Sequence, residues 1–186
     1  MNKIIAVIGM CGSGKSETVK FFEEHGYKKV YFGEVVMNEM KRLGLEVNET
    51  NERQTRENLR KEFGMAAYAI KSKAKIDELI KAHNAVVLDG LYSWEEYVYL
   101  KKEFPTLTLI HIYAEPQKRY ERLSHRKVRP IPLEKCYERD ITEIENLNKG
   151  GPIAIADYLI ENNEDDLEVL HKKIDLLLTR LEIQSQ

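Results

Sequence analysis

Residues 9–16 read Gly-Met-Cys-Gly-Ser-Gly-Lys-Ser, and this stretch decides the fold. It follows an apolar run at residues 4–8 that predicts a buried strand, and it leads into a helical pattern at residues 14–25. The stretch matches G-x-x-x-x-G-K-[ST], the Walker A phosphate-binding loop, in the strand–loop–helix setting that the motif requires. A chance glycine-rich turn is the alternative, but the agreement of strand, loop and helix favours a phosphate-binding loop.

The residue types in this stretch suit a nucleoside triphosphate. Glycine adopts backbone conformations that other residues avoid, so the N–H groups of the loop can turn inward toward phosphate oxygens, next to the positive end of a helix. Lys15 would reach the β- and γ-phosphates, and the Ser16 hydroxyl would bind Mg²⁺. The residues predicted to bind the nucleotide here are Gly9, Gly12, Ser13, Gly14, Lys15, Ser16 and Glu17.

Composition narrows the class of protein. A length of 186 residues fits one domain, and a hydrophobic fraction of 42% is enough for one core. The 29 basic and 31 acidic residues give a formal charge of −2, which argues against attraction of the whole surface to nucleic acid or anionic lipid. Because we see neither a run of ~20 apolar residues nor room for a signal peptide, we expect a cytoplasmic protein. Cys11, in the loop, is more simply a small residue than a redox switch.

Apolar runs alternate with helical patterns along the rest of the chain. Helices are predicted where apolar residues recur at 3-4 spacing, with a last helix that Asn163 caps. Strands separated by helices indicate a parallel sheet covered on both faces, so a ligand should lie above the carboxyl ends of the strands. The predicted strands are residues 4–8, 28–32, 85–88, 107–113 and 157–160, and the helices before the last are residues 14–25, 34–43, 55–82, 93–103, 116–125 and 133–148.

Two acidic residues follow predicted strands and so fall at this end of the sheet. Asp89, which precedes Gly90, could orient Mg²⁺ or accept a hydrogen bond from the substrate, or it could simply be a turn residue. Glu34 could orient an acceptor hydroxyl or stabilise the first turn of its own helix. Asp89 is therefore a candidate catalytic and metal-binding residue, and Glu34 is a candidate substrate-binding residue.

Basic residues dominate residues 117–130, where Glu121 is the one acid among six Lys and Arg residues. Arg119, Arg122 and Arg126 recur at helical spacing, so one face would carry all three, and they would repel one another unless an anion lies between them. Polyphosphate is the favoured anion, because guanidinium groups bind its oxygens in pairs and offset charge on the γ-phosphoryl group. A solvated face or a nucleic-acid surface is the alternative. Arg122 and Arg126 are thus candidate catalytic cations.

Several motifs, taken in order, resemble one family. The motifs and their order along the chain resemble those of the nucleoside monophosphate kinase group of P-loop kinases, and the resemblance covers nearly the whole chain. Within the group the chain is most similar to dephospho-coenzyme A kinase and to an uncharacterised, mainly archaeal, family of kinase-like proteins. The motifs are the loop at residues 9–16, Asp89-Gly90, the arginine-rich helix with Arg129-Pro130-Ile131-Pro132 after it, Glu138-Arg139-Asp140, and Ala156-Asp157-Tyr158-Leu159-Ile160-Glu161-Asn162.

The resemblance implies an α/β, three-layer P-loop NTPase fold with a five-stranded parallel sheet in the order 2-3-1-4-5 and helices on both faces. Residues 1–186 would form a single kinase domain, with a helical acceptor-binding region at residues 34–82 and a mobile lid at residues 124–133. Arg119 and Arg129 would contact ATP from the lid and its supporting helix. Asn162 would lie in the loop that borders adenine.

The acceptor-binding region has its own candidates. Arg53, Arg56 and Arg60 recur at 3-4 spacing and could hold the phosphate of the acceptor, or they could belong to an exposed face balanced by neighbouring glutamates. Adenylate kinases carry an arginine shortly after the Asp-Gly of the third strand, and here Tyr92 is among the residues in its place. Tyr92 could stack on a base of the acceptor or pack against helices, and a plain adenylate kinase is not favoured.

The resulting interpretation is an ATP-dependent small-molecule kinase. It would use ATP and Mg²⁺ and transfer the γ-phosphoryl group to a nucleotide-like acceptor, dephospho-coenzyme A or a nucleoside monophosphate, with neither nucleic acid nor membrane as a partner. The alternative is a regulatory ATP-binding protein without an acceptor. A GTPase switch would need Asn-Lys-x-Asp, whereas residues 148–151 read Asn-Lys-Gly-Gly. The acceptor and the oligomeric state stay open at this point.

Overall fold

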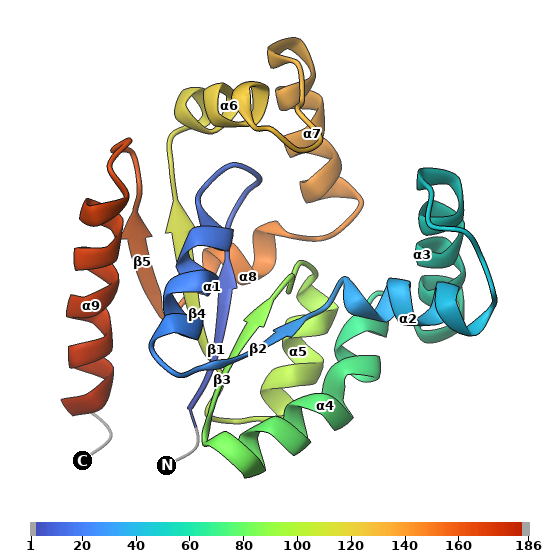
Figure 1. Ribbon diagram of the computed structural model, residues 1–186, viewed down its shortest axis with the longest axis horizontal. Helices are drawn as coiled ribbons and strands as arrows, with labels where there is room; N and C mark the ends of the chain where they lie inside the picture. The colour runs from blue at the N-terminus through green and yellow to red at the C-terminus, as the bar shows by residue number, and fades with distance from the viewer. Residues whose placement is uncertain (1–2, 184–186) are drawn as a thin grey trace.

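The first apolar run forms the central strand of a five-stranded parallel sheet. A computed structural model describes residues 3–183. Every strand pairing is parallel, and the spatial order is β2-β3-β1-β4-β5 (Figure 1), so the predicted fold class and strand order are confirmed. The strands are β1 (Lys3–Ile8), β2 (Lys28–Tyr31), β3 (Ala85–Asp89), β4 (Thr108–Tyr113) and β5 (Tyr158–Glu161).

Both faces of the sheet are buried, which explains why β1 reads as a continuous apolar run rather than an alternating one. Successive side chains of a strand point to opposite faces. Ile4 and Ile8 belong to one hydrophobic core, whereas Ile5 and Val7 belong to the other. The sheet is therefore the middle layer of three.

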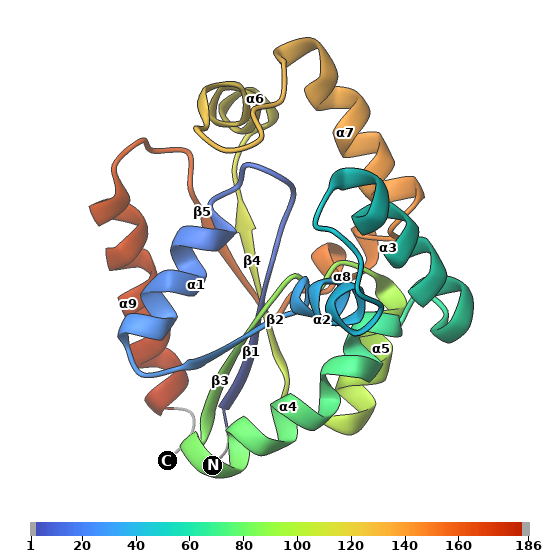
Figure 2. The same ribbon diagram turned by 45° about the vertical axis from the view of Figure 1, so that its right-hand side comes forward.

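Helices cover each face, and a third group lies beyond the carboxyl ends of the strands. α1 and α9 cover one face, while α4, α5 and α8 cover the other (Figure 2). Within residues 3–183, no helix has the length and apolar character needed to cross a membrane. The helices are α1 (Lys15–Glu24), α2 (Glu34–Arg42), α3 (Glu49–Phe63), α4 (Ala67–His83), α5 (Trp94–Glu103), α6 (Pro116–His125), α7 (Leu133–Glu145), α8 (Gly150–Ala154) and α9 (Leu167–Ile183).

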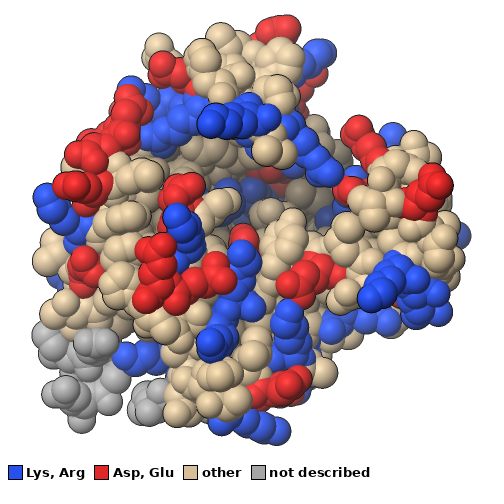
Figure 3. Space-filling model, viewed as in Figure 1, with Lys and Arg blue, Asp and Glu red and all other residues tan. Residues whose placement is uncertain are grey.

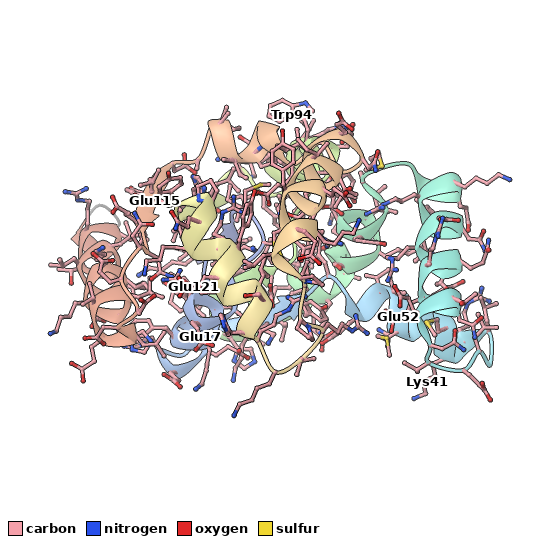
Figure 4. All side chains as sticks on the ribbon, turned by 90° about the horizontal axis from the view of Figure 1, so that it is seen from above. Glu17, Lys41, Glu52, Trp94, Glu115 and Glu121 are labelled. Atoms are coloured by element: carbon pink, nitrogen blue, oxygen red, sulfur yellow. The ribbon has the colours of Figure 1, made fainter. Side chains whose placement is uncertain are left out.

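The helices α6 and α7 stand above the phosphate loop, and α2 and α3 project to one side (Figure 1). Seen from above in Figure 4, α6 and α7 lie between α9 on one side and α3 on the other. In the space-filling view of the face seen in Figure 1, basic side chains form a band over a hollow (Figure 3). The hollow lies where the carboxyl ends of the strands predict a ligand.

Two of the predicted helices are wrong. The single helix expected at residues 55–82 is two helices, because Gly64 adopts φ 72° and ends α3, a backbone conformation that favours glycine. α3 begins earlier than expected, at Glu49, and the side chain of the capping residue Asn48 accepts a hydrogen bond of 2.9 Å from the Asn51 N–H. The last helix begins at Leu167 rather than after Asn163. The Asn163 side chain instead accepts a hydrogen bond from the Glu115 N–H at 2.8 Å and so joins β5 to the start of α6.

Candidate nucleotide and phosphoryl-transfer site

The loop between β1 and α1 has the conformation that its glycines predict. Gly9, Gly12 and Gly14 all have positive φ values, of 143°, 81° and 103°. A Cβ atom on Gly14 would lie 2.3 Å from Asn162 Nδ2, and one on Gly12 would lie 2.7 Å from the Arg119 carbonyl oxygen. The loop is thus packed against β5 and α6, and alanine at these positions would be both strained and crowded.

Lys15 lies folded back over this loop. Its ammonium group donates a hydrogen bond of 2.8 Å to the Met10 carbonyl oxygen. Burial, and secondly the positive charge of Lys149, lower the pKa of Lys15 to about 7. A phosphate anion at the loop would offset both effects and restore the charge of Lys15, so the loop and its lysine fit the group that the Walker A motif predicts.

Ser16 and Asp89 are the predicted oxygen ligands of Mg²⁺, and this role stays a prediction. Ser16 and Glu17 are exposed in the first turn of α1. Asp89 ends β3 and pairs with Val7 of β1 on one side and with Tyr31 of β2 on the other. Burial raises the pKa of Asp89, while Lys29 and Lys15 oppose that shift. Within the described residues, no group of three His, Cys, Asp or Glu side chains could hold a metal ion.

Ser13 faces a cavity of about 210 Å³ beside the loop. Its Oγ atom is buried and has no hydrogen-bond partner within the described part of the chain. His111 of β4 lines the same cavity, and burial together with the charge of Lys15 lowers its pKa. The Ser13 hydroxyl is therefore available to a bound group or water, although its predicted contact with the nucleotide stays a prediction.

The expectation that Arg119 shares with Arg122 and Arg126 a helix face open to an anion is wrong. Its Nη1 and Nη2 donate to the two carboxylate oxygens of Asp140 at 2.8 and 2.6 Å, and Nη1 also donates to the Cys11 carbonyl oxygen at 3.2 Å. The residue is 5% exposed. Arg119 therefore joins α6, α7 and the phosphate loop. The spacing of the arginines could not reveal this because Asp140 lies on another helix.

Arg122 and Asn162 connect α6 and β5 to the loop. Arg122 donates to the Asn162 carbonyl oxygen at 2.8 Å and to that of Glu164 at 2.7 Å. The Asn162 side chain donates to the Ser13 carbonyl oxygen at 2.9 Å. Arg122 is thus linked to the phosphate loop through Asn162. Contacts of Arg122 and Asn162 with ATP stay predictions.

Arg126 and Arg129 lie in the predicted lid, beyond the end of α6. Arg126 is exposed and donates from Nε to the Arg129 carbonyl oxygen at 2.5 Å. Arg129 adopts φ 50°, and its Nη2 lies 3.3 Å from Glu52 Oε1 on α3. Glu52, labelled in Figure 4, also accepts a hydrogen bond of 3.3 Å from Arg56. The lid segment therefore reaches the predicted acceptor-binding region.

The arginines of α3 have different surroundings. Arg53 is exposed and pairs with Glu57 at 2.9 Å, as the alternative of a balanced exposed face expects. Arg56 pairs with Glu52 at 3.3 Å. Arg60 lies over the ring of Tyr68, 5.3 Å from its centroid. Arg56 and Arg60 thus remain candidates for an anionic acceptor, and Arg53 points to solvent.

The predicted acceptor-binding region and the start of α5 contain buried hydroxyl and carboxyl groups that the sequence analysis missed, of which Tyr68 lies against Arg60. Tyr68 Oη and Thr55 Oγ1 are buried and have no hydrogen-bond partner among the described residues. Glu96 is buried, accepts hydrogen bonds from the Tyr92 and Ser93 N–H groups at 2.8 and 3.0 Å, and has a pKa that burial raises to about 7. The capping-box spacing of Ser93 and Glu96 was a signal in the sequence, whereas nothing local marks the buried hydroxyls.

The other two predicted substrate residues follow the ends of the adjacent strands β2 and β3. Glu34 is half-exposed and forms an ion pair with Lys75 of α4. Tyr92 follows β3, and burial, with the nearby Asp89 carboxylate, raises its pKa. The side chain of Lys149 lies 4.6 Å from the centroid of the Tyr92 ring. Lys149 and its buried partner Glu143 are further residues that the sequence analysis missed.

The strand order and the phosphate loop after β1 together define a P-loop kinase fold. The family model described as an AAA domain matches residues 5–143. The UPF0200 protein of Thermococcus sibiricus is 36% identical over 187 residues, which cover 98% of this chain and 97% of that protein. The chain therefore belongs to the UPF0200 family.

Solved structures of kinases share the fold. Shikimate kinase from Bacteroides thetaiotaomicron superposes with a TM-score of 0.63 at 16% identity, covering 98% of this chain and 99% of that one. A gluconokinase from Sinorhizobium meliloti superposes with a TM-score of 0.56 at 17% identity, covering 100% of this chain and 98% of that one. The resemblance to P-loop kinases is confirmed at the level of the fold, and the closeness to dephospho-coenzyme A kinase stays a prediction.

Proposed function

We propose that this protein is a kinase that transfers the γ-phosphoryl group of ATP to a nucleotide-like small molecule, dephospho-coenzyme A or a nucleoside monophosphate. The observation that carries the proposal is the position of α6, whose Arg119 bonds to a carbonyl oxygen of the phosphate loop and whose Arg122 bonds to the residue that holds Ser13. The basic segment and the loop thus meet at one place. A polyphosphate there would lie between cations from two parts of the chain.

The chain's own residues would bind, neutralise and shield the reacting group. Loop N–H groups and Lys15 would hold the β- and γ-phosphate oxygens, and Arg122 and Arg126 would offset the charge that develops in the transition state. Mg²⁺, held by Ser16 and Asp89, would supply further charge neutralisation between the phosphates. The predicted lid at residues 124–133 would exclude water, which otherwise competes with the acceptor for the phosphoryl group.

The acceptor would lie between the lid, α3 and the start of α5. Arg56 and Arg60 supply positive charge, which suits the phosphate of a nucleotide-like molecule. Tyr68 supplies a buried hydroxyl without a partner among the described residues, and Glu34 and Tyr92 stand at the neighbouring strand ends. A buried polar group of this kind is costly unless a ligand or water satisfies it.

A screen of acceptors tests the proposal. Dephospho-coenzyme A, nucleoside monophosphates and shikimate-like alcohols are each mixed with ATP, and acceptor-dependent ADP release is measured. Lys15→Ala should lower the rate at least ~100-fold, because it removes a cation from the transferring group. Lys20→Ala, which changes an exposed lysine of the same helix, should leave the rate unchanged. ATP binding without ADP release for any acceptor would instead favour the regulatory ATP-binding protein.

A further inference from the structure

The cavity of about 210 Å³ beside the phosphate loop is a feature that the proposed mechanism does not use. Its walls come from the loop, from β4 and the residues that follow it, from the start of α6 and from α8. Ser13 of the loop is one of the lining residues. Lys15 and Ser16, which would hold the phosphates and Mg²⁺, and Asn162, which would border adenine, are not among the described residues that line it.

The cavity lies on the face of the sheet that α8 covers. Ile110 belongs to the core on the α1 side, and because successive side chains of a strand alternate, His111 points to the opposite face. Ile153 of α8 packs against the core of that opposite face. In Figure 2, α1 and α8 lie on opposite sides of β4. The cavity is therefore on the other side of β4 from α1, the helix that carries Lys15 and Ser16.

The Ser13 hydroxyl is an unsatisfied polar group in this cavity. Ser13 is 1% exposed, and its Oγ atom has no hydrogen-bond partner within the described residues. Close packing below the loop holds the hydroxyl near β4, since a Cβ atom on Gly9 would lie 2.8 Å from Ser13 Oγ and 2.3 Å from the Ile112 carbonyl oxygen. A buried hydroxyl is costly to leave without a partner, so a ligand or a water should bond to it.

Water alone would be held poorly here. A cavity of this size takes several waters, and each ordered water needs about three hydrogen bonds. Much of the wall cannot supply them, because Met10, Ala114, Pro116 and Ile153 contribute apolar side chains. Loosely held water is displaced at a gain by a ligand that covers the apolar wall and bonds to Ser13.

The charges of the wall favour a neutral ligand. Arg119 is the one cation among the described residues that line the cavity, and none of them is acidic. Its guanidinium is already paired with both carboxylate oxygens of Asp140 and donates to the Ala114 and Cys11 carbonyl oxygens, each at 3.2 Å. His111 is 8% exposed, and burial lowers its pKa, so its imidazole is neutral at pH 7 and offers one donor and one acceptor. An anionic ligand would find no free counter-charge.

The volume and the rings of the wall suit a planar ligand of two fused rings. A protein cavity of about 150 Å³ binds benzene, so about 210 Å³ has room for a second fused ring. The rings of His111 and Tyr113 meet at 81° with centroids 6.2 Å apart and offer aromatic surface to a flat molecule. A purine carries nitrogen acceptors and N–H donors around its edge, which match the Ser13 hydroxyl and the imidazole.

We propose that this cavity is a second ligand site, which binds a neutral purine-type base and is separate from the ATP site of the proposed function. The Ser13 hydroxyl and the His111 imidazole bond to the edge of the base, and the side chains of Met10, Pro116 and Ile153 cover its faces. The rival is a cavity that holds only water.

Calorimetric titration with adenine tests the proposal on protein saturated with ADP, which keeps adenine out of the ATP site. Adenine should still bind, and Ile153→Trp, which fills the cavity, should weaken its binding at least about tenfold. Ile155→Trp changes an exposed residue just after α8 that does not line the cavity, and it should leave the Kd of adenine within about twofold. Failure of adenine to bind, equal affinity of Ile153→Trp and the unaltered protein, or equally tight binding of the planar anion benzoate would overturn the proposal.

A second variant keeps the test decisive if Ile153→Trp fails to fold. Ser13→Ala removes only the hydroxyl, and at an ADP concentration that saturates this variant it should weaken adenine binding roughly two- to tenfold, as expected for one neutral hydrogen bond. An unchanged Kd would contradict the role of Ser13. Adenine that binds only without ADP would show that it enters the ATP site, and would reject a second site. Because no acceptor and no phosphoryl transfer are involved, these outcomes are independent of the acceptor screen.

Discussion

Removing one partner of the buried pair of Arg119 and Asp140 should destabilise this protein strongly. Their side chains are 6% and 10% exposed, and two nitrogen–oxygen bonds of 2.8 and 2.6 Å join them. Asp140→Asn keeps the shape and removes the counter-charge of Arg119. Leaving a buried charge without its partner costs about 3–5 kcal/mol. For a chain of 186 residues that corresponds to a fall in Tm of roughly 6–20 °C.

Chemical denaturation at pH 7 measures this effect directly. The exposed pair of Arg53 and Glu57 is the control, and Arg53→Gln should leave the free energy of unfolding nearly unchanged because solvent screens this pair. Replacing both buried partners, as Arg119→Met with Asp140→Leu, should recover most of the loss because no unpaired charge remains. A cost below about 1 kcal/mol for Asp140→Asn, or a double variant no more stable than the single one, would refute this reasoning.

Three other predictions concern protons and the lid. Without a nucleotide the pKa of Lys15 is about 7, so at pH 8 most of the lysine is neutral, and the phosphates of a bound nucleotide should restore its charge by the uptake of a proton. Calorimetry in buffers of different ionisation enthalpy measures this uptake. The variant Lys15→Met should abolish it. Glu96 has a pKa of about 7 in the folded state against 4.5 unfolded, so its contribution to stability should fall as pH rises from 4.5 to 7, and Glu96→Gln should flatten that slope in denaturation curves. Glu52→Gln weakens the contact of Arg129 with α3, so it should speed proteolytic cleavage at residues 126–132 while it changes the free energy of unfolding by less than about 1 kcal/mol. An unchanged cleavage rate would show that Glu52 does not restrain the lid.

The sequence predicts the sheet well because each strand is an apolar run between turn residues. Strand boundaries agree within one or two residues, as at β4, predicted at residues 107–113 and observed at Thr108–Tyr113. The ends of the helices were harder to predict from the sequence. Asn163 and Asp166 are both good capping residues, and tertiary contact of Asn163 with Glu115 decides that α9 begins after the second. The strand order came from the family resemblance and not from periodicity.

The site was predictable only where it is local in sequence. The phosphate loop carries its glycines, its lysine and its serine within eight residues, and Asp89 stands at a strand end that any parallel sheet would place nearby. The sequence does not reveal which residues on distant helices pair with the arginines of the site. Asp140 is 21 residues from Arg119, and Arg129 is 77 residues from Glu52. Spacing within one helix shows which side chains share a face, but not which charge from elsewhere covers that face.

The buried face of α7 limits how the lid can move. Cys136, Asp140 and Glu143 form this face at helical spacing. Its two carboxylates hold Arg119 against the phosphate loop and Lys149 beside the ring of Tyr92. Moving α7 away from the loop would separate two buried ion pairs, each costly to break. The link at residues 126–132, by contrast, is held to α3 by one contact of 3.3 Å from an exposed arginine. Opening and closing should therefore be confined to this link, while α7 keeps its place and its two buried ion pairs in either state.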